Sequence, residues 1–93
     1  RGWAAIQLQN PLADTGLLFV YRLDDACDRQ RIYPRCLGDW EYMVQDVDQP
    51  DAPPVRYSGQ DLTANGLEIH LPSRFSAALY RLTITEEEKG EII

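Results

Sequence analysis

The sequence has few of the residues that carry chemistry or bind nucleic acid: one histidine, two cysteines, and 9 Lys and Arg against 15 Asp and Glu. The net charge of −6 argues against a nucleic-acid partner, because that binding depends on cationic side chains that neutralise phosphates. An anionic membrane surface is disfavoured for the same reason. No apolar run approaches the roughly 20 residues that span a bilayer, and the charged-then-apolar pattern of a signal peptide is missing. We therefore expect neither nucleic acid nor a membrane among the partners.

Cysteine is too scarce for a disulfide framework, since only Cys27 and Cys36 are present. Two reduced thiols are favoured over a single bridge that closes a small loop. A zinc site needs further ligands, and His70 is the only histidine, so no metal and no other cofactor is expected. Reduced thiols favour a cytoplasmic location, with a secreted parent protein as the open alternative.

The length of 93 residues, with 44% hydrophobic and 26% charged residues, is typical of one small globular domain. The first residue is arginine rather than methionine, so we expect a piece of a longer chain. The domain is predicted to span residues 1–85. Residues 86–93 are predicted to form an acidic, flexible tail.

Short apolar runs, separated by turn signals at fairly even intervals, predict an all-β fold. We expect an antiparallel Greek-key β-sandwich of about seven to eight strands with no long helix. The predicted strands are 3–9, 17–23, 31–37, 40–46, 55–57, 67–71 and a last strand through 78–84. The run at 17–23 is apolar on both faces, which predicts a central strand covered on both sides. Residues 24–30 are predicted to form a polar loop, and Pro34 marks an edge or a bulge because it cannot donate to a ladder.

A capping signal interrupts the strands at Ser58, which is followed three residues later by Asp61 in place of the usual Glu or Gln. It predicts a single helical turn. Gly66 is expected to end this turn with a positive φ, which glycine adopts at little steric cost. In the strand that follows, Ile69 and Leu71 are predicted to face inward and His70 outward.

Catalytic constellations are weak in this sequence. His70 is better explained as an exposed strand residue than as a member of a Ser-His-Asp triad. The acids cluster in loops and in the tail, as solvated turns do, and a domain this small has little volume for a cleft between paired carboxylates. Asp46, Asp48 and Asp51 could offer oxygen ligands to calcium, but they lack the spacing and the glycine of a known calcium loop. No catalytic or metal-binding residue is predicted.

Large aromatic side chains remain as candidates for function. Most are expected to fill the core or cover an interface. The alternative is a sugar-binding platform, since sugars pack their apolar faces on exposed rings, and the candidates for either role are Trp3, Trp40 and Tyr57. Trp3 is the better interface candidate because it begins the first strand. An arginine group is predicted to form a salt-bridged rim, with docking to an acidic partner as the alternative: Arg22, Arg29, Arg31 and Arg35.

The order of several short segments also resembles a known family. These segments are 3–7 with Asn10-Pro11, 16–22, 31–33, Leu37-Gly38, 42–46, 57–59, Leu62, Gly66-Leu67 and 76–80. In this order they resemble the C-terminal β-domain of melibiase-type α-galactosidases of glycoside hydrolase family 36. The resemblance implies a sandwich packed on a catalytic (β/α)8 barrel. The two catalytic aspartates of such enzymes lie on the barrel, so no position here inherits them.

The resulting hypothesis is a non-catalytic accessory domain of an α-galactosidase-like glycoside hydrolase. It would stabilise the barrel of the same parent chain. Whether it also stabilises a homo-oligomer is left open by the sequence. One alternative is a carbohydrate-binding module that uses exposed aromatic rings. A third is a free-standing immunoglobulin-like interaction domain, which predicts well-covered polar outer faces and no large apolar patch.

Overall fold

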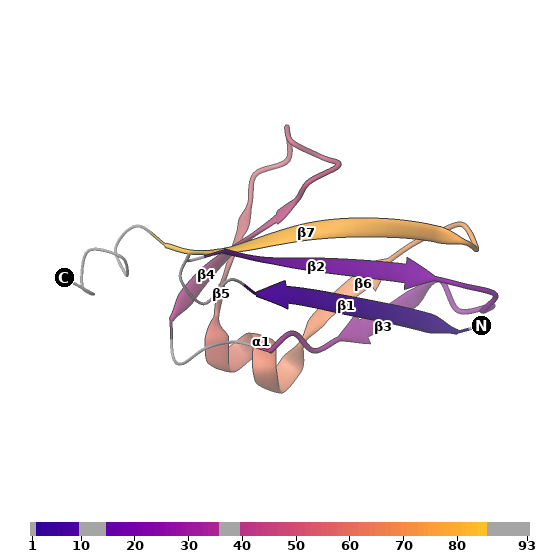
Figure 1. The fold of residues 1–93 in the computed structure, drawn as a ribbon, viewed down its shortest axis with the longest axis horizontal. Coiled ribbons are helices and arrows are strands. Elements are labelled where there is room, and N and C mark those ends of the chain that lie inside the picture. Colours follow the sequence, from indigo (N-terminus) through magenta and orange to yellow (C-terminus); the bar gives the residue numbers. More distant parts are fainter. Residues whose placement is uncertain (1, 10–14, 36–39, 86–93) are drawn as a thin grey trace.

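The computed structural model describes residues 2–9, 15–35 and 40–85, and these form seven strands and one short helix (Figure 1). In chain order the elements are β1 (Trp3–Gln9), β2 (Thr15–Arg22), β3 (Arg29–Ile32), β4 (Glu41–Asp46), β5 (Val55–Ser58), α1 (Gly59–Asn65), β6 (Leu67–His70) and β7 (Ser76–Ile84). The prediction of an all-β chain without a long helix is confirmed. The predicted tail, residues 86–93, lies outside the described residues, as do residues 10–14 and 36–39.

The strands form two antiparallel sheets, one of five strands in the order β1-β2-β7-β4-β5 and one of two strands, β3-β6. The last strand, β7, lies between β2 and β4, which is the kind of crossing order that a Greek-key sandwich has. In Figure 1, β3 and β6 pass behind β1 and β2, and α1 lies below β1 in the view. The sandwich is therefore confirmed, with two layers of unequal size.

The third strand differs most from its prediction. It begins at Arg29, inside the segment expected to be a loop, because its four residues pair with those of β6 from Arg29↔His70 to Ile32↔Leu67. It ends at Ile32 rather than residue 37. Pro34, in the segment that follows β3, is buried and has no N–H to continue a ladder.

The core lies between the five-stranded sheet on one side and β6 and α1 on the other. In β2 every second residue is buried, and Leu18 and Val20 are 1% and 0% exposed. These side chains belong to a single buried cluster: Leu18, Val20, Tyr42, Val44, Leu62, Leu67, Ile69, Leu71 and Leu82. The pattern follows from the two-residue period of a strand, which sends alternate side chains to opposite faces.

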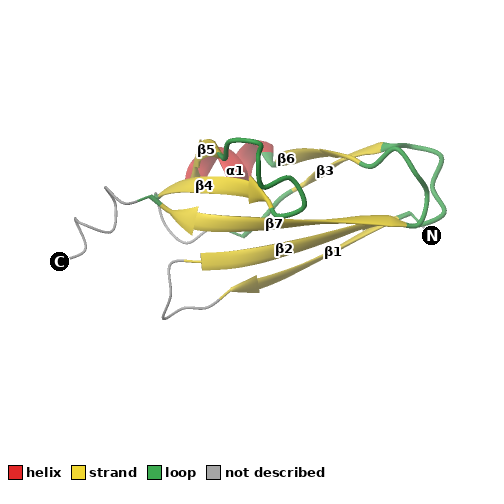
Figure 2. Cartoon of the chain, turned by 90° about the horizontal axis from the view of Figure 1, so that it is seen from above, coloured by secondary structure: helices red, strands yellow, loops and turns green. Residues whose placement is uncertain are grey.

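Strand β2 is central, as predicted, because it pairs with β1 on one side and β7 on the other. The prediction that it is covered on both faces is wrong for the described residues. Its other face carries Leu17, Phe19 and Tyr21, which are only half-buried. The two-stranded sheet β3-β6 and the helix α1 both lie on the opposite side of the five-stranded sheet, so they leave this face without a covering layer (Figure 2).

The helix α1 begins and ends as its sequence predicts. Ser58 is the N-cap, and its side chain accepts a hydrogen bond from the backbone N–H of Asp61 at 3.0 Å. Gly66 has φ of +70° and donates its N–H to the Leu62 carbonyl. The helix has seven residues rather than a single turn, and it places Leu62, which is 0% exposed, in the core.

Candidate functional site

The uncovered face of the five-stranded sheet is the most unusual surface of this domain. Strand register places Ile6 opposite Phe19 and Leu8 opposite Leu17, and places Phe19 opposite Leu79 of β7. Residues directly opposite each other share a face of the sheet. We call the part of this side that β1, β2 and β7 form the outer face: Ala4, Ile6, Leu8, Leu17, Phe19, Tyr21, Ala77, Leu79 and Arg81.

Most residues of the outer face are apolar. Ile6 and Leu8 are 53% and 54% exposed, although each is flanked by further apolar side chains from β2. Arg81 is the only charged residue in the set. Scattered single apolar residues are normal on a protein surface, but a contiguous patch marks an interaction site. Side chains of this kind suit the burial of one protein surface against another.

The edge next to this face is also unprotected. Among the described residues β1 pairs only with β2, and its seven residues include neither a charge nor a proline. The opposite edge, β5, has four residues with Arg56 among them and follows Pro53 and Pro54. Short strands, charges and prolines are the usual protection of a sheet edge against pairing with other chains. The edge strand β5 is therefore protected, whereas the edge strand β1, which contributes to the outer face, is not.

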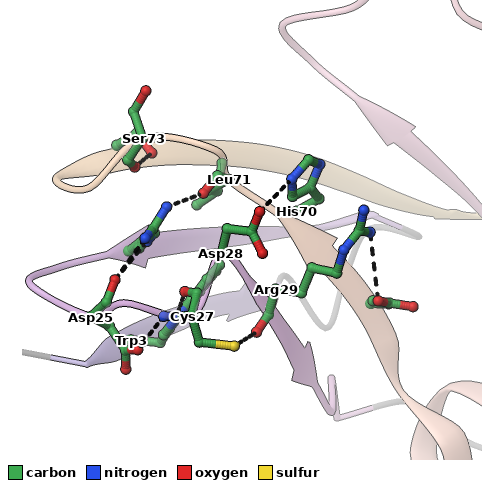
Figure 3. Close-up of polar contacts among 11 residues, drawn as sticks. Trp3, Asp25, Cys27, Asp28, Arg29, His70, Leu71 and Ser73 are labelled. Carbon is green, nitrogen blue, oxygen red and sulfur yellow. Dashed lines mark hydrogen bonds and ion pairs between the residues drawn. The ribbon is translucent and has the colours of Figure 1, made fainter.

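The three aromatic residues singled out from the sequence lie elsewhere. Trp3, Trp40 and Tyr57 are half-buried and pack against the core cluster. The indole Nε1 of Trp3 donates to the Cys27 carbonyl at 3.2 Å, which ties the start of β1 to the loop before β3 (Figure 3). This placement fits the expectation of core-packing rings better than that of a sugar platform.

His70 projects from the exposed side of β6, as predicted, and meets Asp28, with 3.1 Å between Nε2 and Oδ2 (Figure 3). The hydrogen bond from His70 is the main reason that the pKa of Asp28 is lowered. Sequence reasoning missed Asp28 because it is 42 residues from His70. The signal would have been the pairing of Arg29 with His70, which brings the preceding residue beside the histidine.

The arginines divide into two classes. Arg29 and Arg31 approach Glu68 at 3.7 and 3.6 Å, so the predicted salt-bridged rim is correct for them. It is wrong for Arg22, which is 4% exposed and donates to the Leu71 carbonyl at 2.7 Å and twice to the Asp25 carbonyl. The Arg35 side chain makes no ion pair with a described residue. Its backbone instead bonds to Gln7.

The acidic loop after β4 is held by local hydrogen bonds. Asp46 accepts from the backbone N–H of Asp48 at 3.0 Å, and the Gln45 amide donates to three carbonyls of the same loop. No group of three metal-ligating side chains occurs within residues 2–9, 15–35 and 40–85. Tyr80 lies opposite Asp46 in the register, and burial, followed by the charges of Asp46 and Asp48, raises its pKa.

Cys27 is an exposed free thiol whose Sγ lies 3.0 Å from the Arg29 carbonyl. Cys36 lies outside the described residues. No helix in the described part of the chain is long and apolar enough to cross a bilayer.

Comparison with known proteins finds no match for this chain. No protein-family model matches the chain, no curated protein is similar to it, and no solved structure matches its fold.

Proposed function

We propose that this chain is a non-catalytic accessory domain, which packs its outer face on the catalytic (β/α)8 barrel of an α-galactosidase-like glycoside hydrolase. The observation that carries the docking role is the exposure of Ile6 and Leu8, each more than half exposed within an apolar face that no described element covers. The choice of parent enzyme is supported by the resemblance of the short sequence segments, in their order along the chain, to the C-terminal β-domain of family 36 α-galactosidases.

The energetics of such a contact are favourable. A stable protein interface buries about 800 Å² on each partner. Somewhat more than half of such an area is apolar, so at about 25 cal/mol per Å² of apolar area the burial provides roughly 11 kcal/mol per partner before the costs of association are subtracted. The neighbouring edge of β1 is uncharged and extends the same surface. A domain attached to its partner by the chain avoids part of the association cost, because linked binding is intramolecular.

The placement of the polar groups supports a non-catalytic role. His70 and Asp28 are exposed and bond each other, and neither lines the cavity beside β1 or the pocket between β4, β5 and β6. Arg29, Arg31 and Glu68 form a surface group, and Arg22 is fully engaged with backbone carbonyls. A general acid–base pair needs groups that reach a bound substrate, which these arrangements do not offer.

A double substitution on the outer face tests the proposal. Ile6→Ser with Leu8→Ser should leave the isolated domain folded, because both side chains are largely exposed there. In the full-length parent enzyme the same pair should lower the melting temperature by several degrees and shift any subunit association. Val55→Ser is the matched control, since Val55 is also 53% exposed but lies on β5 at the other edge. Equal melting temperatures for the parent enzyme and its double variant would refute the docking role.

The free-standing immunoglobulin-like alternative predicts polar, well-covered outer faces. The outer face is apolar and half-exposed, which disfavours that alternative. Size-exclusion chromatography with light scattering would separate the two, because a domain built to stand alone should stay monomeric at high concentration.

A further inference from the structure

A cavity of about 480 Å³ opens on the inner side of β1, away from the outer face. It lies between β1 and the segment that follows β3. Its walls are formed by Ala5, Gln7, Gln9, Leu18, Ile32, Tyr33 and Arg35. The volume is within the range of about 300–1,000 Å³ that small-molecule sites occupy.

The segment that forms one wall is fixed to β1 by a pair of hydrogen bonds. The Gln7 side chain donates through Nε2 to the Arg35 carbonyl and accepts through Oε1 from the Arg35 N–H, both at 2.7 Å. An amide that bonds both backbone groups of one residue replaces a rung of sheet pairing. Gln7 and Arg35 are 28 residues apart, so this contact links β1 to the distant segment that follows β3.

Tyr33 is held in place from behind by the end of α1. A Cβ added at Gly66 would lie 3.0 Å from the Cδ2 atom of Tyr33, so the ring packs directly on the glycine backbone. Pro34, which is buried, restricts the backbone of the residue before it, Tyr33. The Tyr33 side chain is nevertheless 57% exposed. A fixed aromatic ring with a free surface is therefore one wall of the cavity.

Polar groups converge on the same space. Gln9 accepts a long 3.4 Å hydrogen bond from Gln7, and its amide nitrogen makes no hydrogen bond with a described residue. The Arg35 side chain is exposed and forms no ion pair with a described residue, unlike Arg29 and Arg31. Gln9 and Arg35 both line the cavity, which thus combines an aromatic residue with polar ones.

We propose that this cavity binds one pyranose ring, with the C–H face of the sugar on Tyr33 and its hydroxyl groups on Gln9 and Arg35. A pyranose has one apolar face and a rim of hydroxyls that both donate and accept, which is the combination that these walls match. A wholly apolar ligand would leave the amide and the guanidinium without partners, which costs free energy. A polyphosphate would meet one cation in a chain of net charge −6. The site is separate from the outer face and does not depend on the docking proposal.

The test is a titration of the 15N-labelled domain with the methyl pyranosides of glucose, galactose and mannose. At least one should produce saturable shifts of the backbone amides of Gln9, Ile32 and Arg35, with a dissociation constant of millimolar order. Tyr33→Ala should weaken this binding about tenfold, the loss of roughly 1.4 kcal/mol that one stacking contact can supply. Arg35→Gln should weaken it about threefold.

Phe75→Ala is the matched control, because Phe75 is 72% exposed and does not line the cavity. It should bind the sugar as the unchanged domain does. Unchanged dispersion of the amide spectrum shows that each variant is folded. Absence of shifts at these amides with all three sugars at about 50 mM would overturn the proposal. Equal weakening by Tyr33→Ala and Phe75→Ala would overturn it too, and neither result would bear on docking of the outer face.

Discussion

The two faces of the five-stranded sheet are built by alternate residues of the same strands, but the chain completes only one of them. On the inner face, Leu18, Val20 and Leu82 are at most 3% exposed. On the outer face, Ile6 and Leu8 are more than half exposed, although they are equally apolar. An apolar pattern therefore indicates that a face is to be covered, but it does not say whether the covering layer belongs to the same chain.

The difference arises from the number of elements that remain after the large sheet is formed. Five strands enter the sheet, and the other two, with α1, form one small layer on one side (Figure 2). That layer contributes Leu62, Leu67, Ile69 and Leu71 to the core. A larger covering element would be needed for the second face, and the docking proposal assigns that role to a neighbouring domain.

The sharpest test of this comparison exchanges two adjacent leucines for alanine. Leu18→Ala on the inner face should destabilise the isolated domain by about 2–5 kcal/mol, because it removes buried contacts and leaves a cavity. Leu17→Ala, one residue earlier on the outer face, should cost less than about 1.5 kcal/mol, because Leu17 is only half-buried there. Urea denaturation followed by tryptophan fluorescence measures both.

The two leucine variants control for each other, since they make the same chemical change in the same strand. Equal losses would mean that the outer face is already covered in the free domain. A large additional loss for Leu17→Ala in the parent enzyme would show that the covering layer comes from there.

A similar comparison is offered by two arginines on opposite faces. Arg22→Met should lower the free energy of unfolding by about 2–4 kcal/mol, because the buried carbonyls of Asp25 and Leu71 lose their donors. Arg81→Met is the control on the exposed outer face and should change stability by about 0.5 kcal/mol or less. Thermal melts of both variants measure these losses of stability. An Arg22→Met variant as stable as the native chain would contradict the prediction and show that water replaces the guanidinium there.

Much of the fold was accessible from sequence because it rests on local signals. Alternation fixed β1, β4 and β7 to within about two residues, and Ser58 and Gly66 marked both ends of α1. The third strand was misplaced because its pairing with β6 is non-local, and Arg29 to Arg31 carry no apolar alternation. The half-exposed state of β2 was also missed, since an isolated strand pattern contains no information about the other layer.

The functional surfaces were less accessible for the same reason. Trp3, Trp40 and Tyr57 are conspicuous in the sequence, but they pack on the core. Tyr33, which lines the cavity, owes its position to Gly66, a contact that depends on how β3 and α1 meet. The role of Arg22 depends on Leu71, 49 residues away. These relations are set by tertiary packing and have no counterpart in local composition.

The smallest expected effect concerns the margin of the covering layer, where Asp28 meets His70. The hydrogen bond from His70 lowers the pKa of Asp28 below its usual 3.8, so the folded state favours the carboxylate more than the unfolded state does. The contribution to stability is therefore present above pH 3.8 and is lost as the pH falls through the lower folded value. Both groups are exposed, so the effect is small and is reduced by salt.

Urea denaturation of the native chain and of Asp28→Asn between about pH 2 and pH 6 should give curves that differ above pH 3.8 and converge below it. Curves that stay parallel over that range would show that the Asp28–His70 pair does not help to hold the two-stranded sheet β3-β6 against the inner face.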